Sequence, residues 1–154
     1  MSMSQFNIYL KTPDYLSDWL RREMWNEDEQ RIVFPRNSAE WIVLSLFIGK
    51  RPATAPIDVA ADGLLPVKVP TLPGKNPAVF NYLSDSGKLA IINTIKRRFK
   101  KMMWDELHVI KPDEVQITDI IYAFMEKHGI GNNEKNWETI RQMYFRMRKT
   151  YDPK

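Results

Sequence analysis

The chain has 154 residues, of which 44% are hydrophobic, and its formal net charge is +4. This length suits one domain or two small lobes, and the apolar share excludes a fully disordered protein. Cysteine is absent from the sequence, which excludes disulfides, thiol nucleophiles and thiolate metal sites and is typical of a reducing compartment.

No segment has the pattern of a secretion signal or a membrane span. The start of the chain is polar, and the longest apolar stretch covers residues 41–48. That stretch is far shorter than the roughly 20 residues that a membrane-spanning helix needs. We therefore predict a cytoplasmic protein with no membrane partner.

The start of the chain predicts a strand followed by a helix. Phe6, Ile8 and Leu10 alternate with polar residues, which is the two-residue period of a half-buried strand. The sequence Thr12-Pro13-Asp14 is typical of a helix start, because threonine caps free amides and proline suits the first helical position. We expect this helix to end at about Trp25.

A second helix is predicted after a short strand over residues 32–34. Asn37 or Ser38 should cap it, with Glu40 in the position of a capping box. Residues 41–48 are apolar nearly all round, a pattern that predicts a central, buried helix.

Residues 51–83 form a proline-rich segment that we interpret as a connector or β-ribbon between two lobes, or as a partner-binding arm. Prolines exclude a regular helix here. Residues 65–69 are predicted to form an edge strand, because a sheet tolerates proline at its edge. The prolines are Pro52, Pro56, Pro66, Pro70, Pro73 and Pro77.

Residues 84–154 are predicted to form a unit of three helices, over about 87–108, 115–128 and 136–151. Ser84 to Ser86 should cap the first helix, Pro112-Asp113-Glu114 should start the second, and Asn136 should cap the third. Gly129 stands where a helix C-cap belongs. The predicted buried positions are Leu89, Ile92, Ile95, Phe99, Met102 or Met103, and Leu107 in the first helix, Ile117, Ile120, Ile121, Phe124 and Met125 in the second, and Trp137, Ile140, Tyr144, Met147 and Tyr151 in the third.

Positive charge is concentrated in two stretches of this second half. Residues 86–111 have a net charge of +5 and residues 141–154 a net charge of +4, whereas residues 112–140 between them have −4. The distribution therefore predicts two basic surfaces on different helices, which is the pattern of a nucleic-acid footprint.

The first basic surface lies on the long helix. With Phe99 inward, the surrounding cations spread over the solvent side, within reach of phosphates. The alternative is an ordinary solvated helix face. The candidate residues are Lys96, Arg97, Arg98, Lys100 and Lys101.

The second basic surface lies on the last helix, which with its predecessor resembles a helix-turn-helix pair. In such a pair the second helix enters the major groove of DNA. The turn over 129–135 is longer than usual and the preceding helix is acidic, so a basic terminal helix of a bundle is the equal alternative. The candidate residues are Arg141, Arg146, Arg148 and Lys149.

Other residue types favour structural roles. The five tryptophans have helical spacing and are interpreted as core residues with satisfied N–H groups. His108 and His128 follow helix bodies, where a positively charged imidazolium would favour the negative end of the helix dipole. No phosphate loop, dinucleotide fingerprint or metal-ligand spacing is present. We therefore predict no catalytic residues, no metal and no cofactor.

A resemblance adds an expectation about biological context. Its residues are Phe34-Pro35-Arg36-Asn37-Ser38-Ala39-Glu40, Asn81-Tyr82-Leu83, Met125-Glu126-Lys127-His128-Gly129-Ile130 and Trp137. With these segments the chain resembles an uncharacterised family of small basic proteins carried by bacterial prophages and mobile elements. The resemblance implies a role in DNA transactions and no particular activity.

The sequence as a whole predicts a helix-dominated α+β fold. It comprises a strand and helix lobe over 1–50, a connector over 51–83 and a helix-turn-helix-like unit over 84–154, with one compact domain as the alternative. The predicted function is DNA binding as an accessory or regulatory protein of a mobile element, without enzymatic activity. The alternative is a structural or adaptor protein that binds a protein partner or self-assembles.

Overall fold

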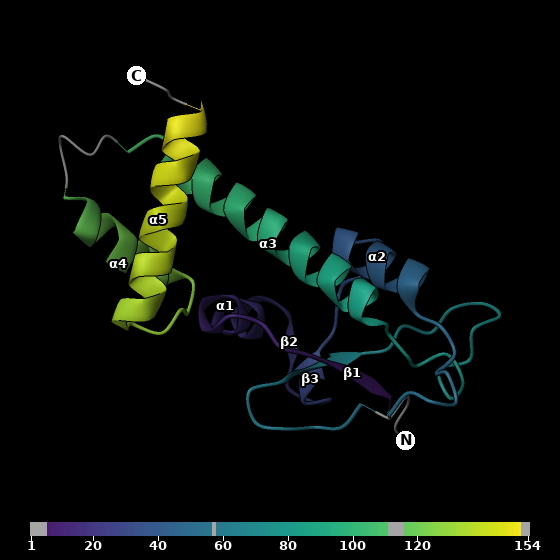
Figure 1. Cartoon of the computed structure of the whole chain (residues 1–154). Helices are drawn as coiled ribbons and strands as arrows, with labels where there is room; N and C mark the ends of the chain where they lie inside the picture. Colours follow the sequence, from purple (N-terminus) through teal and green to yellow (C-terminus); the bar gives the residue numbers. More distant parts are fainter. Residues whose placement is uncertain (1–5, 57, 111–115, 152–154) are drawn as a thin grey trace. The chain divides into compact units, whose positions relative to one another are not determined.

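The computed structural model describes residues 6–56, 58–110 and 116–151, which form five helices and a small four-stranded sheet (Figure 1). This confirms the helix-dominated α+β fold. The predicted helix start at Pro112 to Glu114 lies outside the described residues. The helices are α1 (Asp14–Met24), α2 (Ala39–Phe47), α3 (Asp85–Leu107), α4 (Ile117–Lys127) and α5 (Glu134–Tyr151), and the strands are β1 (Asn7–Leu10), β2 (Trp25–Asn26), β3 (Arg31–Ile32) and β4 (Leu65–Lys68).

The chain divides into two compact units. The sheet unit comprises residues 1–12 and 23–95, and the helical unit comprises residues 13–22 and 96–154. Most of α1 and the second half of α3 therefore belong to the helical unit, together with α4 and α5. The proline-rich segment 51–83 lies wholly in the sheet unit and supplies β4.

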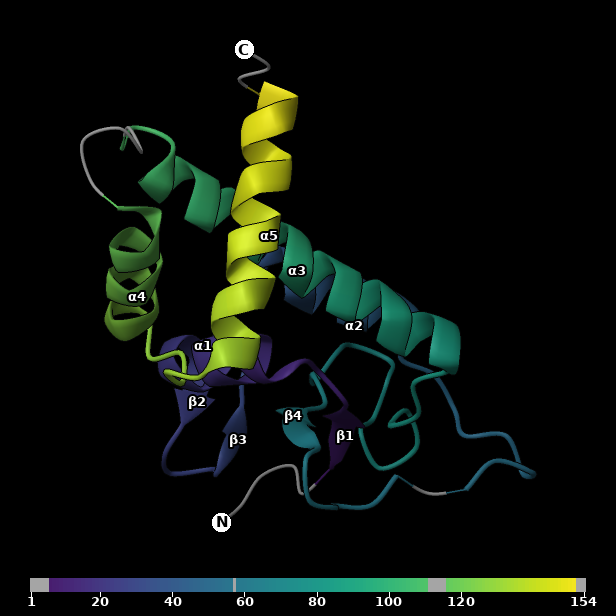
Figure 2. The same ribbon diagram turned by 60° about the vertical axis from the view of Figure 1, so that its left-hand side comes forward.

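The sheet has the strand order β1-β4-β3-β2. β4 pairs antiparallel with β1, from Asn7 opposite Lys68 to Leu10 opposite Leu65, and parallel with β3 (Figure 2). The expected edge position of this strand is therefore wrong, because β4 lies inside the sheet. Its pairing with β3 has a single register pair, Ile32 with Val67. Because this ladder is so short, an interior strand can contain Pro66 without losing a long row of hydrogen bonds.

Helix ends follow the predicted chemistry with one shift in position. Ser38 Oγ accepts a hydrogen bond from the amide of Trp41, and Ser84 Oγ accepts one from the amide of Gly87. Asn136 does not cap the last helix, because α5 begins earlier and Asn133 Oδ1 accepts the bond from the Asn136 amide. These caps satisfy amides that a helix leaves without internal partners.

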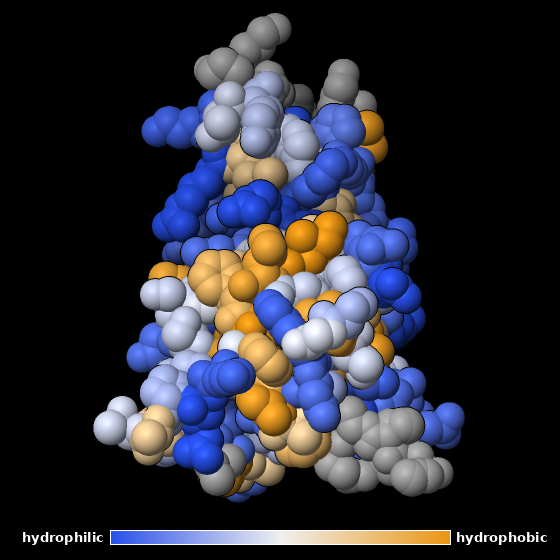
Figure 3. Space-filling view, turned by 90° about the vertical axis from the view of Figure 1, so that its right-hand side faces the viewer, coloured by the Kyte–Doolittle hydropathy of each residue, from blue (hydrophilic) through white to orange (hydrophobic). Residues whose placement is uncertain are grey.

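Helix α2 differs most from its prediction as a central, buried helix. Its side chains are 45% exposed at Ile42, 74% at Leu46 and 43% at Phe47, whereas its one charged residue, Glu40, is fully buried. Glu40 stands at the second helical position after the Ser38 cap, so the expected capping box does not form. Figure 3 views the side on which α2 and the start of α3 lie in Figure 1, and it shows hydrophobic residues exposed among hydrophilic ones.

The buried stripe of α3 is shifted at its start. Ile91, Ile95, Phe99, Met103 and Leu107 are buried, at successive spacings of four residues. Leu89, predicted to be buried, is 59% exposed. Leu89 and Ile91 are two positions apart on the helix, so they face nearly opposite sides and only one of them can join this stripe.

The core of the helical unit is built around Phe99. Its ring centroid lies 5.0 Å from that of Tyr15, 5.1 Å from that of Trp19 and 6.0 Å from that of Phe124, all with edge-to-face geometry. This geometry places the positive edge of one ring against the negative face of another. The three neighbours come from α1 and α4, so Phe99 joins three helices of the unit.

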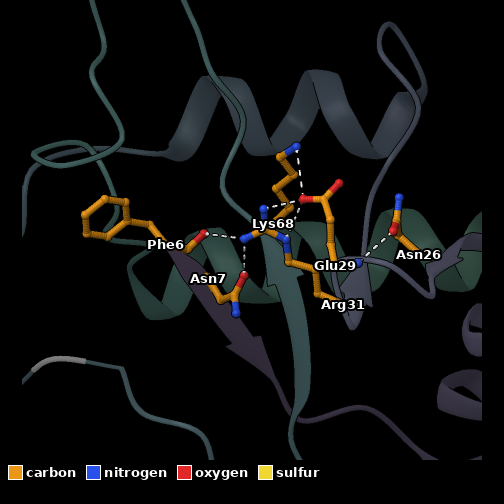
Figure 4. A network of polar contacts seen from close by, with 6 residues as sticks. All are labelled: Phe6, Asn7, Asn26, Glu29, Arg31 and Lys68. Atoms are coloured by element: carbon orange, nitrogen blue, oxygen red, sulfur yellow. Dashed lines mark hydrogen bonds and ion pairs between the residues drawn. The ribbon is translucent and has the colours of Figure 1, made fainter. Parts of the chain in front are cut away.

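A buried arginine joins three parts of the sheet unit (Figure 4). Arg31, on β3, is 4% exposed and donates to Asn7 Oδ1 of β1 at 2.8 Å and to the Glu29 carboxylate. Lys68, on β4, lies 3.3 Å from the same carboxylate oxygen. The hydrogen bond from Arg31, and then the charge of Lys68, lower the pKa of Glu29 against the opposing effect of burial.

Replacing Glu29 with glutamine is expected to destabilise the protein by about 2 kcal/mol, since the buried Arg31 loses its anionic partner. Because the pKa of Glu29 is lower in the folded state, its contribution is present above the unfolded pKa and is lost as the pH falls through the folded value. Urea unfolding at neutral and acidic pH should show the difference shrinking in acid. Asp28→Asn, an exposed carboxylate in the same turn, is the control and should change stability little.

Candidate nucleic-acid interface

The five predicted cations of α3 lie on more than one side of the helix. Lys96 and Lys100 are one turn apart on the side of the helix that also carries Trp104. Arg97 and Lys100 are exposed. Lys96, Arg97 and Lys100 form no ion pair among the described residues. These three side chains are therefore available to an anion.

Arg98 and Lys101 of α3 have partners within the helical unit. The guanidinium of Arg98 lies 4.6 Å from the ring centroid of the buried Trp19, a cation–π contact. Lys101 Nζ lies 2.7 Å from Asp105 Oδ2, one turn along the same helix. A nucleic acid would have to compete with Asp105 for Lys101, so these two residues are weaker candidates than their neighbours.

Arg148 links α5 to the end of α3 through hydrogen bonds. Its guanidinium donates to the carbonyl oxygens of His108 and Ile110 and to Tyr144 Oη, the last at 2.7 Å. It also lies 5.4 Å from the ring centroid of Trp104. These contacts use the fork of the guanidinium inside the unit, so Arg148 is a structural residue rather than a free phosphate ligand.

Arg141 lies on the same flank of α5 as Arg148 and is also engaged. It forms an ion pair with Glu138 at 3.3 Å and lies 5.1 Å from the ring centroid of Phe145 and 5.8 Å from that of Trp137. This flank therefore alternates cations with aromatic rings, and its charge is partly neutralised.

The outer face of α5 has a different composition. It presents a row of hydrogen-bond donors at spacings of four, three, four and three residues, which places them in one stripe. Arg146 and Lys149, predicted from the basic tail, are exposed in this row and form no ion pair among the described residues. The row consists of Lys135, Thr139, Gln142, Arg146 and Lys149.

The row contains no carboxylate, although neighbouring acids touch two of its members. Lys135 Nζ lies 3.9 Å from Asp14, both side chains being largely exposed, and Gln142 donates to Glu138 at 3.3 Å. Sequence reasoning missed Lys135, Thr139 and Gln142 because it considered net charge alone. Their helical spacing with Arg146 was the signal that could have found them.

The segment between α4 and α5 is held by several hydrogen bonds. Gly129 has a φ of +69° and the amide of Ile130 donates to the carbonyl of Met125, which is a Schellman C-cap. Asp18 of α1 accepts from the amide of Gly131 at 2.8 Å, and the buried Asn136 donates to the carbonyl of the same glycine. Helices α4 and α5 lie side by side in both ribbon views (Figures 1 and 2), so this anchored turn fixes the direction of α5 within the unit.

His128 has a carboxylate partner that its helix-end position did not predict. Its Nε2 lies 2.8 Å from Glu106 Oε2, and Lys127 pairs with the other oxygen. Burial raises the pKa of Glu106, but the hydrogen bonds from Lys127 and His128 outweigh it and the net effect is a lowered pKa. Glu106 therefore joins α3 to the end of α4 as an anion.

The tryptophans divide between core and surface. Trp19 is 1% exposed, as expected of a core residue, but the other four are half-buried. The expectation of satisfied N–H groups is wrong for two of them, since Nε1 of Trp19 and of Trp137 has no hydrogen-bond partner in the part of the chain that the structure describes. Their indoles instead pack against Arg98 and Arg141, respectively, and Trp137 also stacks on Tyr122.

The two units differ in charge. The sheet unit contains eight basic and eight acidic residues and is neutral, whereas the helical unit contains fifteen basic and eleven acidic residues. The whole net charge of +4 therefore belongs to the helical unit. Within residues 6–56, 58–110 and 116–151, no three histidine or acidic side chains gather as metal ligands, and no helix is both long and apolar enough to cross a membrane.

Comparisons with known proteins give no family or relative from which the role of this site could be inferred. No protein-family model, no curated protein and no solved structure matches the chain.

Proposed function

We propose that the helical unit binds DNA, with the outer face of α5 directed at the nucleic acid. The observation that carries the proposal is the row of five donors on α5, exposed at both ends and without a carboxylate among them. Lysine and arginine contact phosphates or guanine, glutamine can pair with adenine, and threonine can contact either a base or the backbone. The row thus has the residue types of a recognition helix.

Three cations on α3 extend the proposed contact. Lys96, Arg97 and Lys100 have no acidic partner among the described residues and belong to the same unit as α5. In this proposal they hold phosphates, while Arg98, Lys101, Arg141 and Arg148 maintain the unit's own structure. The protein would then act as a non-enzymatic, cytoplasmic DNA-binding accessory or regulatory protein, and the resemblance to prophage proteins would place it on a mobile element.

Replacing Lys100 with alanine is expected to weaken DNA binding at all sequences, because a phosphate contact is lost. The slope of log affinity against log salt should become shallower by about 0.9. Fluorescence anisotropy with a labelled random duplex at several salt concentrations would measure both effects. Lys11→Ala removes the same charge from an exposed position in the sheet unit and should leave the slope unchanged. Equal slopes for the two variants would exclude Lys100 from the contact.

A second function, that of a protein-binding adaptor, is favoured by a separate observation in the sheet unit. Helix α2 exposes Ile42, Leu46 and Phe47 in a unit with no net charge. On soluble proteins, contiguous exposed apolar patches of this kind mark sites that bind other proteins. Light scattering would show self-assembly, and a DNA-free complex with another protein would support the adaptor function.

A further inference from the structure

We propose that the exposed face of α2 is a docking site for an amphipathic protein segment whose apolar side chains are flanked by acidic ones. This inference rests on the adaptor function and is independent of DNA binding. It follows from three features of the sheet unit: the reversed polarity of α2, the cations around it and the repulsion that a second copy would meet.

The polarity of α2 is the reverse of that of an ordinary surface helix. Its charged residue, Glu40, is fully buried, whereas Leu46 is 74% exposed. Ile42 and Leu46 are one turn apart, and Ala39 is exposed beside them. A surface helix normally places its apolar stripe toward the core and its charges toward water. The solvent side of α2 has instead the composition of a helix face that packs against another protein element.

Four cations stand at the two ends and on one flank of α2. Arg36 precedes α2, Lys50 and Arg51 follow it, and Lys75 Nζ donates to the carbonyl of Ser45 within it at 3.3 Å. Arg36 lies 5.9 Å from the ring centroid of Trp41, and Lys50 lies 5.5 Å from that of Phe80. None of the four forms an ion pair among the described residues. We call these four cations at the ends and flank of α2 its basic border.

The positive charge of the basic border argues against a second copy of this chain as the occupant. Two antiparallel α2 helices would bring Arg36 of one copy near Lys50 and Arg51 of the other. A parallel pair would bring each cation near its equivalent. Like charges across an interface cost several kcal/mol, whereas carboxylates at these positions would be attracted. An amphipathic helix that lays its apolar face on a hydrophobic surface is a recurring mode of recognition.

The test uses two labelled synthetic peptides of about 15 residues, the length at which an isolated helix becomes marginally stable. Both have leucines at helical spacing, and one has glutamates where the other has lysines. Fluorescence anisotropy with the full chain should show at least tenfold tighter binding of the acidic peptide. Leu46→Glu should abolish that binding, and Lys50→Glu with Arg51→Glu should remove the preference. Val109→Glu, at a 68% exposed position of the helical unit, is the control and should bind as the native protein does.

Four outcomes would overturn the proposal. Equal binding of both peptides would remove the charge argument. Unchanged binding by Leu46→Glu, with native circular dichroism, would place the contact elsewhere. A dimer by light scattering that Leu46→Glu dissociates would make a second copy the occupant and would leave the adaptor function standing. A monomer that binds neither peptide would contradict both the docking proposal and the adaptor function.

Discussion

Replacing Arg148 with alanine is expected to destabilise the protein by about 3 kcal/mol. The change removes hydrogen bonds to the carbonyls of His108 and Ile110 and to Tyr144, and it removes cation–π contacts with Trp104 and Tyr144. Hydrogen bonds from a charged group contribute about 1.5–3 kcal/mol each, and the contacts of one side chain are not additive. Urea unfolding followed by circular dichroism would measure the loss.

The controls separate a structural arginine from a DNA-binding one. Arg148→Lys keeps the charge but cannot reproduce the fork that reaches several acceptors, so about half of the loss should remain. Lys149→Ala, at the next position but exposed, should change stability little. If Arg148→Ala proved as stable as the native protein, the hydrogen bonds of Arg148 to the end of α3 would not exist in solution.

The double replacement Arg146→Ala with Lys149→Ala is expected to weaken DNA binding by about 100-fold near 50 mM salt. Each lost phosphate contact removes about 0.9 from the salt slope, so two contacts remove about 1.8. The fold should be kept, because both side chains are exposed and have no partner among the described residues. Anisotropy titrations of a labelled duplex over a range of salt would give both quantities.

A charge-matched variant is needed for this comparison. Lys11→Glu lowers the net charge by the same two units in the sheet unit. If binding depended on overall charge alone, this variant would lose as much affinity as the double replacement. A specific role of the outer face of α5 requires Lys11→Glu to bind nearly as the native protein does.

Periodicity and capping chemistry predicted most of the secondary structure. The alternation of Ile8 and Leu10 gave β1, and serines at 38 and 84 gave the starts of α2 and α3, because these signals act between residues close in the chain. The α2 environment could not be predicted in this way. An apolar stretch indicates that a helix will be covered, but not whether its own fold or a partner covers it.

The candidate site was predicted in part. Sequence reasoning found the exposed Arg97, Lys100, Arg146 and Lys149, because clusters of cations are visible in one dimension. It could not separate them from Arg98 and Arg148, whose partners lie at Trp19 and at the end of α3, far along the chain. Only the fold brings these residues together. The fold is therefore needed to distinguish a cation that stabilises the unit from one whose side chain is available to an anion.

The salt dependence of DNA binding by the native chain tests the central claim most directly. If Lys96, Arg97, Lys100, Arg146 and Lys149 each neutralise one phosphate, affinity for a random duplex should fall about 500-fold between 50 and 200 mM salt. Absence of binding at the lower concentration, or an affinity that does not change with salt, would contradict the claim that this helical unit recognises the DNA backbone.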